Sequence, residues 1–161
     1  MADSVRLAAL KNLVTTMEGI TVANGYATTV QTVLKEFVDW ETGPPRGTLP
    51  MIGVVPLAAS YEYISARTTS CVGVRISQEV AVEFVYAATT QDIAWQTGDE
   101  MADDIIAAAS VDRTRGGNAL DTRVASVETD AGNADTMDSR GGVAAGIVRL
   151  TLDIVRSLGV S

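Results

Sequence analysis

Four carboxylates are crowded into one short stretch of the chain, and paired carboxylates can perform acid–base catalysis or hold magnesium. They form two pairs with a spacing of four residues, Asp99 with Asp103 and Glu100 with Asp104. That spacing places both members of a pair on the same face of a helix. On an exposed helix face such groups are more commonly solvated charge than ligands, and we favour that interpretation.

A second acidic group lies in the segment 128–142, which reads ETDAGNADTMDSRGG. A calcium-binding loop needs carboxylate or amide residues at its first, third and fifth positions, followed by glycine. If Asp130 is the first position, Gly132 and Ala134 occupy the third and fifth. The calcium pattern fails, and we expect segment 128–142 to be a mobile, solvated acidic loop.

Other catalytic groups are scarce in this sequence, which has no histidine and a single cysteine, Cys71. Histidine is the usual general base and the commonest zinc ligand, and a catalytic cysteine needs a base beside it. We interpret Cys71 as a small buried residue before an apolar strand. The sequence also lacks a Walker-type phosphate loop, the dinucleotide glycine spacing and a nucleophile elbow. We therefore expect neither an enzyme nor a cofactor or metal site.

Two Arg-Gly-Gly tripeptides, at 115–117 and 140–142, raise the alternative of nucleic-acid binding. Binding through phosphates requires a basic face. This chain has 12 basic and 20 acidic residues, which gives a net charge of −8. The charge predicts repulsion from nucleic acid, and we interpret the glycines as turn residues.

The apolar spacing predicts the elements that would position these residues. Apolar residues recur at three and four positions over 3–19, which predicts an N-terminal amphipathic helix. Segment 24–40 has helical spacing but is rich in Val and Thr, and we favour a strand. Residues 49–57 resemble a strand with Pro50 and Pro56 at its ends.

Segment 71–87 carries the clearest strand signal, because apolar residues occupy the even positions and only Gln78 interrupts them. A strand of this length would span about 50 Å and is unusually long. We expect either a bend near Gln78 or a hairpin that projects beyond the domain and needs a partner surface. A second, acidic helix is predicted within 89–110, where helix-dipole attraction favours the early carboxylates. Strands follow at 120–130 and from 143 to about 156.

Two helices and several strands of alternating polarity predict one α+β domain over residues 1–161. The sheet is expected to be mostly antiparallel, with the N-terminal helix and the acidic helix on one face. No apolar run is long enough to span a bilayer, so we expect no membrane association.

Short motifs accompany this order of elements. They are a Gly-Tyr turn at 25–26, Pro50-Met51-Ile52, the sequence DRTRGG at 112–117, and a Val-x-Ser-x-Glu-x-Asp strand at 124–130. Across nearly the whole chain, the order and the motifs resemble the tail terminator, or tail completion, proteins of long-tailed bacteriophages. The motifs are turn and strand patterns, not catalytic signatures.

The resemblance implies a closed ring of this protein, usually a hexamer in that family, at the end of the tail tube. Such a ring ends tube polymerisation and offers a surface to the head–tail connector or neck proteins, while DNA passes through without sequence-specific binding. It implies a place at the head-proximal end of the virion tail, after assembly in the host cytoplasm. On this basis we expect the loop carboxylates to face the lumen or a neighbouring tail component: Asp130, Asp135 and Asp138.

Four residues are candidate subunit-interface residues under this hypothesis: Trp40, Arg113, Arg115 and Arg140. Arg113 and Arg115 would lie near a subunit boundary or anchor the acidic helix. Trp40 and Trp95 are core residues, interface anchors or ligand-stacking residues.

Three alternative functions remain open at this stage. The nearest is another phage neck, tail-completion or tail-tube protein of related fold. A second is a small ligand-binding, metal-binding or enzymatic domain that uses a tryptophan with Asp103 or Asp104. The third is nucleic-acid binding through the Arg-Gly-Gly segments.

Overall fold

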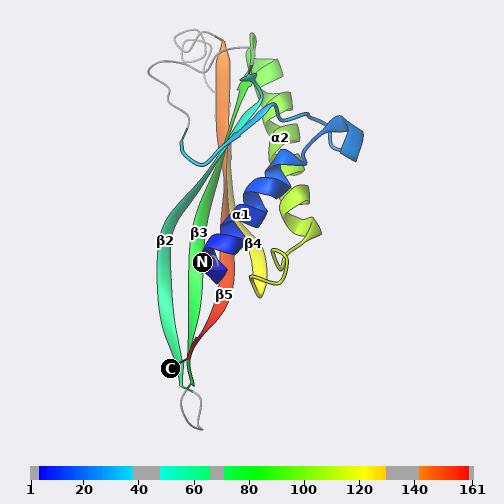
Figure 1. Ribbon diagram of the computed structural model, residues 1–161. Coiled ribbons are helices and arrows are strands. Elements are labelled where there is room, and N and C mark those ends of the chain that lie inside the picture. Colours follow the sequence, from blue (N-terminus) through cyan, green and yellow to red (C-terminus); the bar gives the residue numbers. More distant parts are fainter. Residues whose placement is uncertain (1–3, 38–47, 66–70, 130–141, 160–161) are drawn as a thin grey trace.

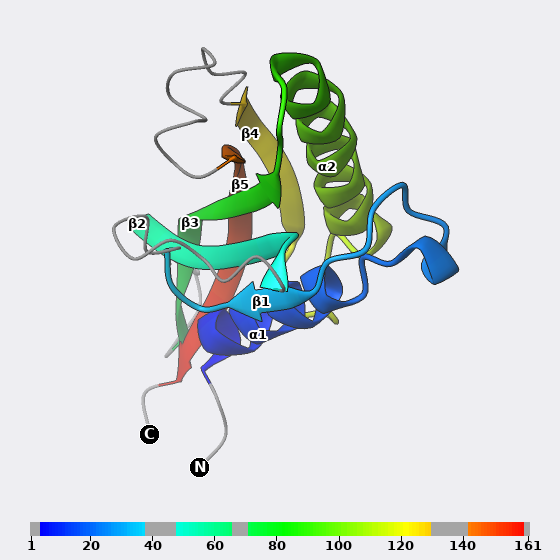
Figure 2. The same ribbon diagram turned by 90° about the horizontal axis from the view of Figure 1, so that it is seen from above.

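The computed structural model describes residues 4–37, 48–65, 71–129 and 142–159, which form a five-stranded sheet with two α-helices on one face (Figures 1 and 2). The strands lie in the order β1-β2-β3-β5-β4, with β1 parallel to β2 and every other neighbouring pair antiparallel. This arrangement confirms the predicted α+β class. The elements in chain order are α1 (Val5–Glu18), the 3-10 turn η1 (Val22–Asn24), β1 (Thr32–Leu34), β2 (Met51–Ser65), β3 (Cys71–Ala87), α2 (Gln91–Val111), β4 (Asp121–Thr129) and β5 (Val143–Gly159).

Both helices begin at a hydroxyl residue that caps them. The Ser4 side chain accepts a hydrogen bond from the Leu7 amide in α1, and the Thr90 side chain accepts one from the Ile93 amide in α2. Each bond satisfies an amide that has no partner within its helix. These caps determine the residues at which the two helices begin.

The core lies between the helices and one face of the sheet. α1 covers the β1–β2 side and α2 covers the β4–β5 side (Figure 2). The even-numbered residues from Val74 to Tyr86 in β3 and from Ala144 to Ile154 in β5 point into this core, as their alternation predicts. The largest fully buried apolar residues are Leu13, Met17, Ile20, Ile52, Phe84, Tyr86, Met101, Ile105, Leu150, Leu152 and Ile154.

The prediction of a strand throughout 24–40 is wrong for most of its described part. Only Thr32–Leu34 forms a strand, and η1 ends at the left-handed Gly25. Residues 38–40 lie outside the described residues. The three-residue strand pairs with Met51–Gly53 at the start of β2. Local β propensity therefore identified the strand type but not its length, which the pairing with β2 determines.

Strand β2 is longer than predicted, because it continues through Pro56 to Ser65. Its pairing with β3 is irregular between Pro56 and Ala59, next to Gln78. The fully buried Gln78 amide donates to the carbonyl oxygens of Leu57 at 3.1 Å and Ala58 at 3.3 Å. A polar residue interrupts the apolar face here because it satisfies carbonyls that the irregular pairing leaves without ladder partners.

Strand β3 matches the predicted segment 71–87, and it also extends beyond the helices as expected. The ends of β2, β3 and β5 project below α1 in Figure 1. Tyr61 and Tyr63 lie in the second half of β2 and are 55% and 74% exposed, and the Tyr61 hydroxyl accepts a hydrogen bond from Arg6 of α1 at 3.5 Å. The length of these strands thus creates a sheet region that the helices do not cover.

Helix α2 runs from Gln91 to Val111, close to the predicted segment 89–110. The four carboxylates at 99–104 therefore lie in the middle of the helix, and the argument from the helix dipole does not apply to them. Gly98 lies against Tyr86, where an added Cβ would be 2.5 Å from the tyrosine oxygen. No helix in the described part of the chain is long and apolar enough to cross a membrane.

Candidate functional site

The DRTRGG motif forms the connection between α2 and β4, and the Asp112 carboxylate organises it. This carboxylate accepts hydrogen bonds from the Thr114 amide, the Thr114 hydroxyl and the Gly116 amide, at 3.1, 2.7 and 2.6 Å. These bonds, with that of the Thr114 hydroxyl the strongest, lower the pKa of Asp112 below its ordinary value. Arg115, Gly116 and Gly117 have positive φ angles of 52°, 67° and 82°. The glycines of this motif are turn residues, as predicted.

Arg115 is the largest fully buried side chain among the described residues. Its guanidinium donates to the carbonyl oxygen of Ala109 in the last turn of α2, and to the Thr16 hydroxyl of α1 at 3.2 Å. Burial lowers the pKa of this guanidinium, while the nearby Asp112 carboxylate acts in the opposite direction. Arg115 therefore ties the end of α2 to α1 from inside the domain.

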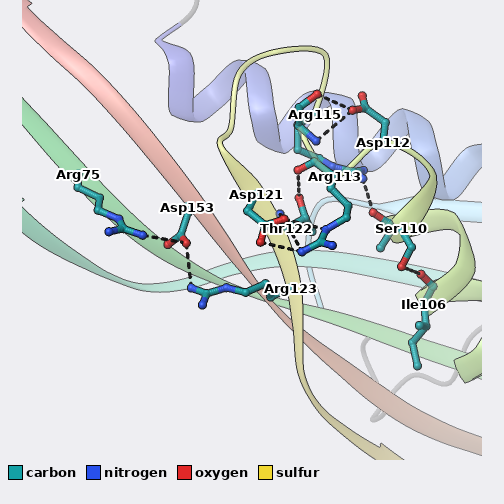
Figure 3. A network of polar contacts seen from close by, with 12 residues as sticks. Arg75, Ile106, Ser110, Asp112, Arg113, Arg115, Asp121, Thr122, Arg123 and Asp153 are labelled. Carbon is teal, nitrogen blue, oxygen red and sulfur yellow. Dashed lines mark hydrogen bonds and ion pairs between the residues drawn. The ribbon is translucent and has the colours of Figure 1, made fainter.

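The neighbouring Arg113 faces outward and binds its own chain. Its guanidinium donates two hydrogen bonds to the Asp121 carboxylate, at 2.7 and 2.8 Å (Figure 3). This forked bond is the main reason that the pKa of Asp121 is lowered. The Thr122 hydroxyl also donates to the carbonyl oxygen of Arg113 at 2.8 Å. The first residues of β4 are thus fixed to the turn that precedes them.

A second ion-pair cluster crosses three strands on the sheet face opposite the helices. The Asp153 carboxylate of β5 accepts from Arg123 of β4 at 2.9 Å and from Arg75 of β3 at 3.3 Å (Figure 3). The Asp153 side chain is 8% exposed, whereas those of the two arginines are about half exposed. The cluster compensates a buried carboxylate with two guanidiniums and links three neighbouring strands.

Asp104 contradicts the interpretation of the α2 carboxylates as solvated charge. It is 8% exposed, and it accepts from the Ala27 amide at 3.0 Å, the Thr28 amide at 2.8 Å and the Thr28 hydroxyl at 2.7 Å. Asp99, Glu100 and Asp103 are exposed, as expected. Asp104 therefore holds the segment between η1 and β1 against α2.

The structure brings together only some of the predicted site residues. Arg113 and Arg115 share one turn, but their side chains point to opposite sides of it. Because Arg115 has no exposed surface, it acts as the internal anchor of the acidic helix and has no surface to offer a neighbouring subunit. Five further predicted residues lie outside the described residues: Trp40, Asp130, Asp135, Asp138 and Arg140.

Sequence reasoning did not identify the cluster around Asp153 or the role of Asp104. Both carboxylates occupy positions where the local pattern of polar and apolar residues predicts a polar, solvent-exposed side chain. Nothing in the neighbouring sequence therefore indicated that they are buried. The register of β5 against β3 and β4 brings Asp153 beside its two arginines. Within the described ranges, no group of three or more cysteine or acidic side chains could hold a metal ion.

The two edges of the sheet are open in different ways. Within the described ranges, β4 is the last strand on one side and pairs only with β5. On the other side, β1 covers only Met51–Gly53 of β2. The rest of β2, from Val54 to Ser65, has no strand on that side among the described residues.

Comparison with models of known protein families and with curated protein sequences found no match.

Proposed function

We propose that this protein is a structural subunit of a closed ring that caps the tail tube of a long-tailed bacteriophage. The ring ends tube polymerisation and presents a surface to the head–tail connector. The proposal rests on the resemblance of the chain to tail terminator proteins, and one structural observation supports it. That observation is the pair of different open edges of the sheet, on β4 and on β2.

The directions of the strands allow these two edges to join. β2 and β5 are both antiparallel to β3, and β4 is antiparallel to β5. β4 consequently runs opposite to β2, so β4 of one copy can pair in antiparallel fashion with β2 of the next. Unpaired edges are templates for such pairing. A contact between two different surfaces is heterologous, and it forms a ring when the rotation closes.

The net charge of −8 suits a ring through which DNA slides. An acidic wall repels phosphates, so DNA passes without being held. Arg113 and Arg140 remain candidate interface residues in this proposal, together with Trp40. The Arg113 guanidinium already binds Asp121, so a contact with another subunit would have to share that carboxylate or replace it.

The direct test combines native mass measurement, negative-stain imaging and addition of the protein to purified tail tubes. We expect closed rings of one copy number that block further growth at tube ends. Long cylinders would support the alternative of a tube protein. A chain that stays monomeric at high concentration and leaves tube growth unchanged would contradict the proposal.

An edge variant makes the test specific. Val127 is 41% exposed on β4. Val127→Lys places a charge on the strand edge that would pair with β2 of the next subunit. We expect this variant to fold and to lose the ring. The matched control is Val22→Lys, because Val22 is 60% exposed but lies in η1, away from both edges.

A further inference from the structure

Trp95 is an unusual surface residue, because 66% of it is exposed on α2 while Met101 and Ile105 of this helix are buried. Large aromatic side chains that remain exposed on one protein are often anchors of an interface. Asp92 and Asp99, three residues before Trp95 and four after it, are also exposed. On a helix these three side chains are neighbours. The surface of α2 here is an indole flanked by carboxylates.

The helical geometry fixes the side of α2 from which Trp95 projects. Asp104 follows Trp95 by nine residues, which is about two and a half turns, so the two side chains leave opposite sides of the helix. Asp104 points toward Ala27 and Thr28, on the segment that leads into β1. Trp95 therefore projects away from the β1 side, toward the side of the sheet that ends in β4.

A groove of complementary character lies on the other side of the domain, between α1 and β2. Its volume is about 180 Å³, which is the space of about six water molecules in the liquid and suits one large side chain. Apolar side chains form most of its wall, and two exposed lysines, Lys11 and Lys35, lie at it. The apolar lining consists of Leu7, Leu10, Val14, Val54 and Pro56.

We propose that Trp95 of one copy inserts into the groove between α1 and β2 of the next copy. This inference rests on the proposed ring, because pairing β4 with the neighbour's β2 also brings α2 beside the neighbour's α1. The occupant of the groove is thus a second copy of this chain. Leu7, which is 42% exposed in one chain, becomes covered by the indole.

Charge complementarity selects this occupant. The groove carries Lys11 and Lys35, whereas the surface around Trp95 carries Asp92 and Asp99. Insertion of the indole brings these opposite charges together at the rim, where they favour the correct partner and register. The apolar contact at the centre supplies most of the affinity, and the charged rim excludes other orientations.

The first experiment follows the environment of Trp95 during assembly. The sequence has two tryptophans, so Trp40→Phe leaves Trp95 as the only one. Because Trp40 is a candidate interface residue, native mass measurement first checks that this variant forms rings. If it does not, the difference in emission between wild-type protein and Trp95→Phe reports Trp95 instead. On ring formation its emission should move to shorter wavelength, and its quenching by acrylamide should fall. Rings in which Trp95 emits and quenches as in the monomer would overturn the insertion and leave the proposed ring intact.

The second experiment keeps both tryptophans and compares Trp95→Ala with Ile93→Ala. Ile93 is an exposed apolar residue in the same turn of α2 but points elsewhere. We expect Trp95→Ala to weaken subunit association about tenfold or more at an unchanged melting temperature, and Ile93→Ala to have little effect. Equal effects of the two variants would overturn the role of Trp95.

A charge exchange tests which surface receives the indole. Lys35→Glu and Asp99→Lys should each weaken the ring, and the double variant should recover most of its stability. Glu100→Lys is the matched control for Asp99→Lys, because it makes the same change one residue further around the helix. A double variant no better than either single variant would overturn the assignment of this groove. If no variant or wild-type protein assembles, even on tube ends, both this inference and the proposed ring fail.

Discussion

The two ends of helix α2 use side chains in opposite ways. At its C-terminal end, the guanidinium of Arg115 is fully buried and contacts only its own chain. Near its N-terminal end, Trp95 is 66% exposed. In most proteins a charged side chain lies outside and an indole is largely buried. The inversion indicates that Arg115 stabilises the domain, and the exposure of Trp95 supports the proposal that this residue contacts a second copy.

The charged side chain of Arg115 can be buried because polar groups of the domain surround its guanidinium. The side chain finds a helix-end carbonyl and a hydroxyl, and the Asp112 carboxylate lies near enough to offset part of the cost of removing the charge from water. The exposed indole needs no such setting in the free subunit. Variants of the two regions should therefore separate stability from assembly.

Among the polar contacts, the largest effect is expected from Arg115→Leu, which removes both hydrogen bonds that join α2 to α1. It leaves the carbonyl oxygen of Ala109 without this donor inside the domain. We expect a loss of about 2–4 kcal/mol in the free energy of unfolding. Denaturant unfolding monitored by circular dichroism measures this value.

Arg113→Leu is the control, because Arg113 lies two residues away and its side chain is 56% exposed. Its loss should be much smaller, as is usual for an exposed ion pair. Equal losses for the two variants would contradict the distinction between an internal anchor and a surface residue.

The next largest effect is expected from Asp104→Ala. This change leaves the amides of Ala27 and Thr28 without their acceptor. We expect a loss of about 1–3 kcal/mol, the usual result when buried donors lose their partner. Asp103→Ala changes an exposed carboxylate one residue earlier and should leave the melting temperature nearly unchanged. Similar losses for both variants would show that Asp104 contributes only general charge.

Part of this arrangement could be predicted from the sequence. The alternation of 71–87 and the spacing of 3–19 identified β3 and α1, because these elements bury one regular face each. The proline residues misled the prediction of β2, which passes through Pro56 at an irregular pairing that Gln78 stabilises. An edge position tolerates proline, and only the neighbouring strands determine which positions lie at the edge.

The polar contacts could not be predicted for a different reason. Asp104 binds a segment 76 and 77 residues away, and Arg115 binds Thr16 at a separation of 99 residues. Local patterns carry no information about such distances. The sequence offered two roles for Arg115, an anchor of the acidic helix or a residue at a subunit boundary, and its burial between α1 and α2 favours the anchor.

A smaller effect is expected at Asp121, and it depends on pH. Its pKa is lower in the folded protein than the ordinary value of 3.8, mainly because of the hydrogen bonds from Arg113. A lowered pKa stabilises the fold above the unfolded value, and this contribution disappears as the pH falls through the folded value. The difference in melting temperature between wild type and Asp121→Asn should be constant above about pH 5 and shrink below pH 4.

Asp112 also has a lowered pKa, and it remains in both proteins, so its own titration cancels in this comparison. A difference in melting temperature that grows with acidification would contradict the assignment of Asp121. Added salt should reduce the difference at neutral pH, because the pair with Arg113 is exposed to solvent.

The smallest effect on the isolated subunit is expected at the projecting end of the sheet. Tyr63 is 74% exposed, so Tyr63→Ser should change the free energy of unfolding by less than about 0.5 kcal/mol. Tyr86 is the matched control. It is 1% exposed, and its hydroxyl donates to the carbonyl oxygen of Ala94 at 2.6 Å. Tyr86→Ser should cost about 3 kcal/mol or more.

The effects of these two variants on ring formation should have the opposite order. When the concentrations of folded protein are matched, Tyr63→Ser should weaken the ring more than Tyr86→Ser does. Tyr63 lies on the part of β2 whose edge has no strand beside it among the described residues, so its loss should weaken the ring more than it weakens the fold. Native mass measurement and thermal unfolding on one sample give both values. If Tyr63→Ser unfolds the subunit as strongly as Tyr86→Ser does, the projecting end belongs to the cooperative core. Its exposed tyrosines would then have a role in folding that their surroundings in the single chain do not explain.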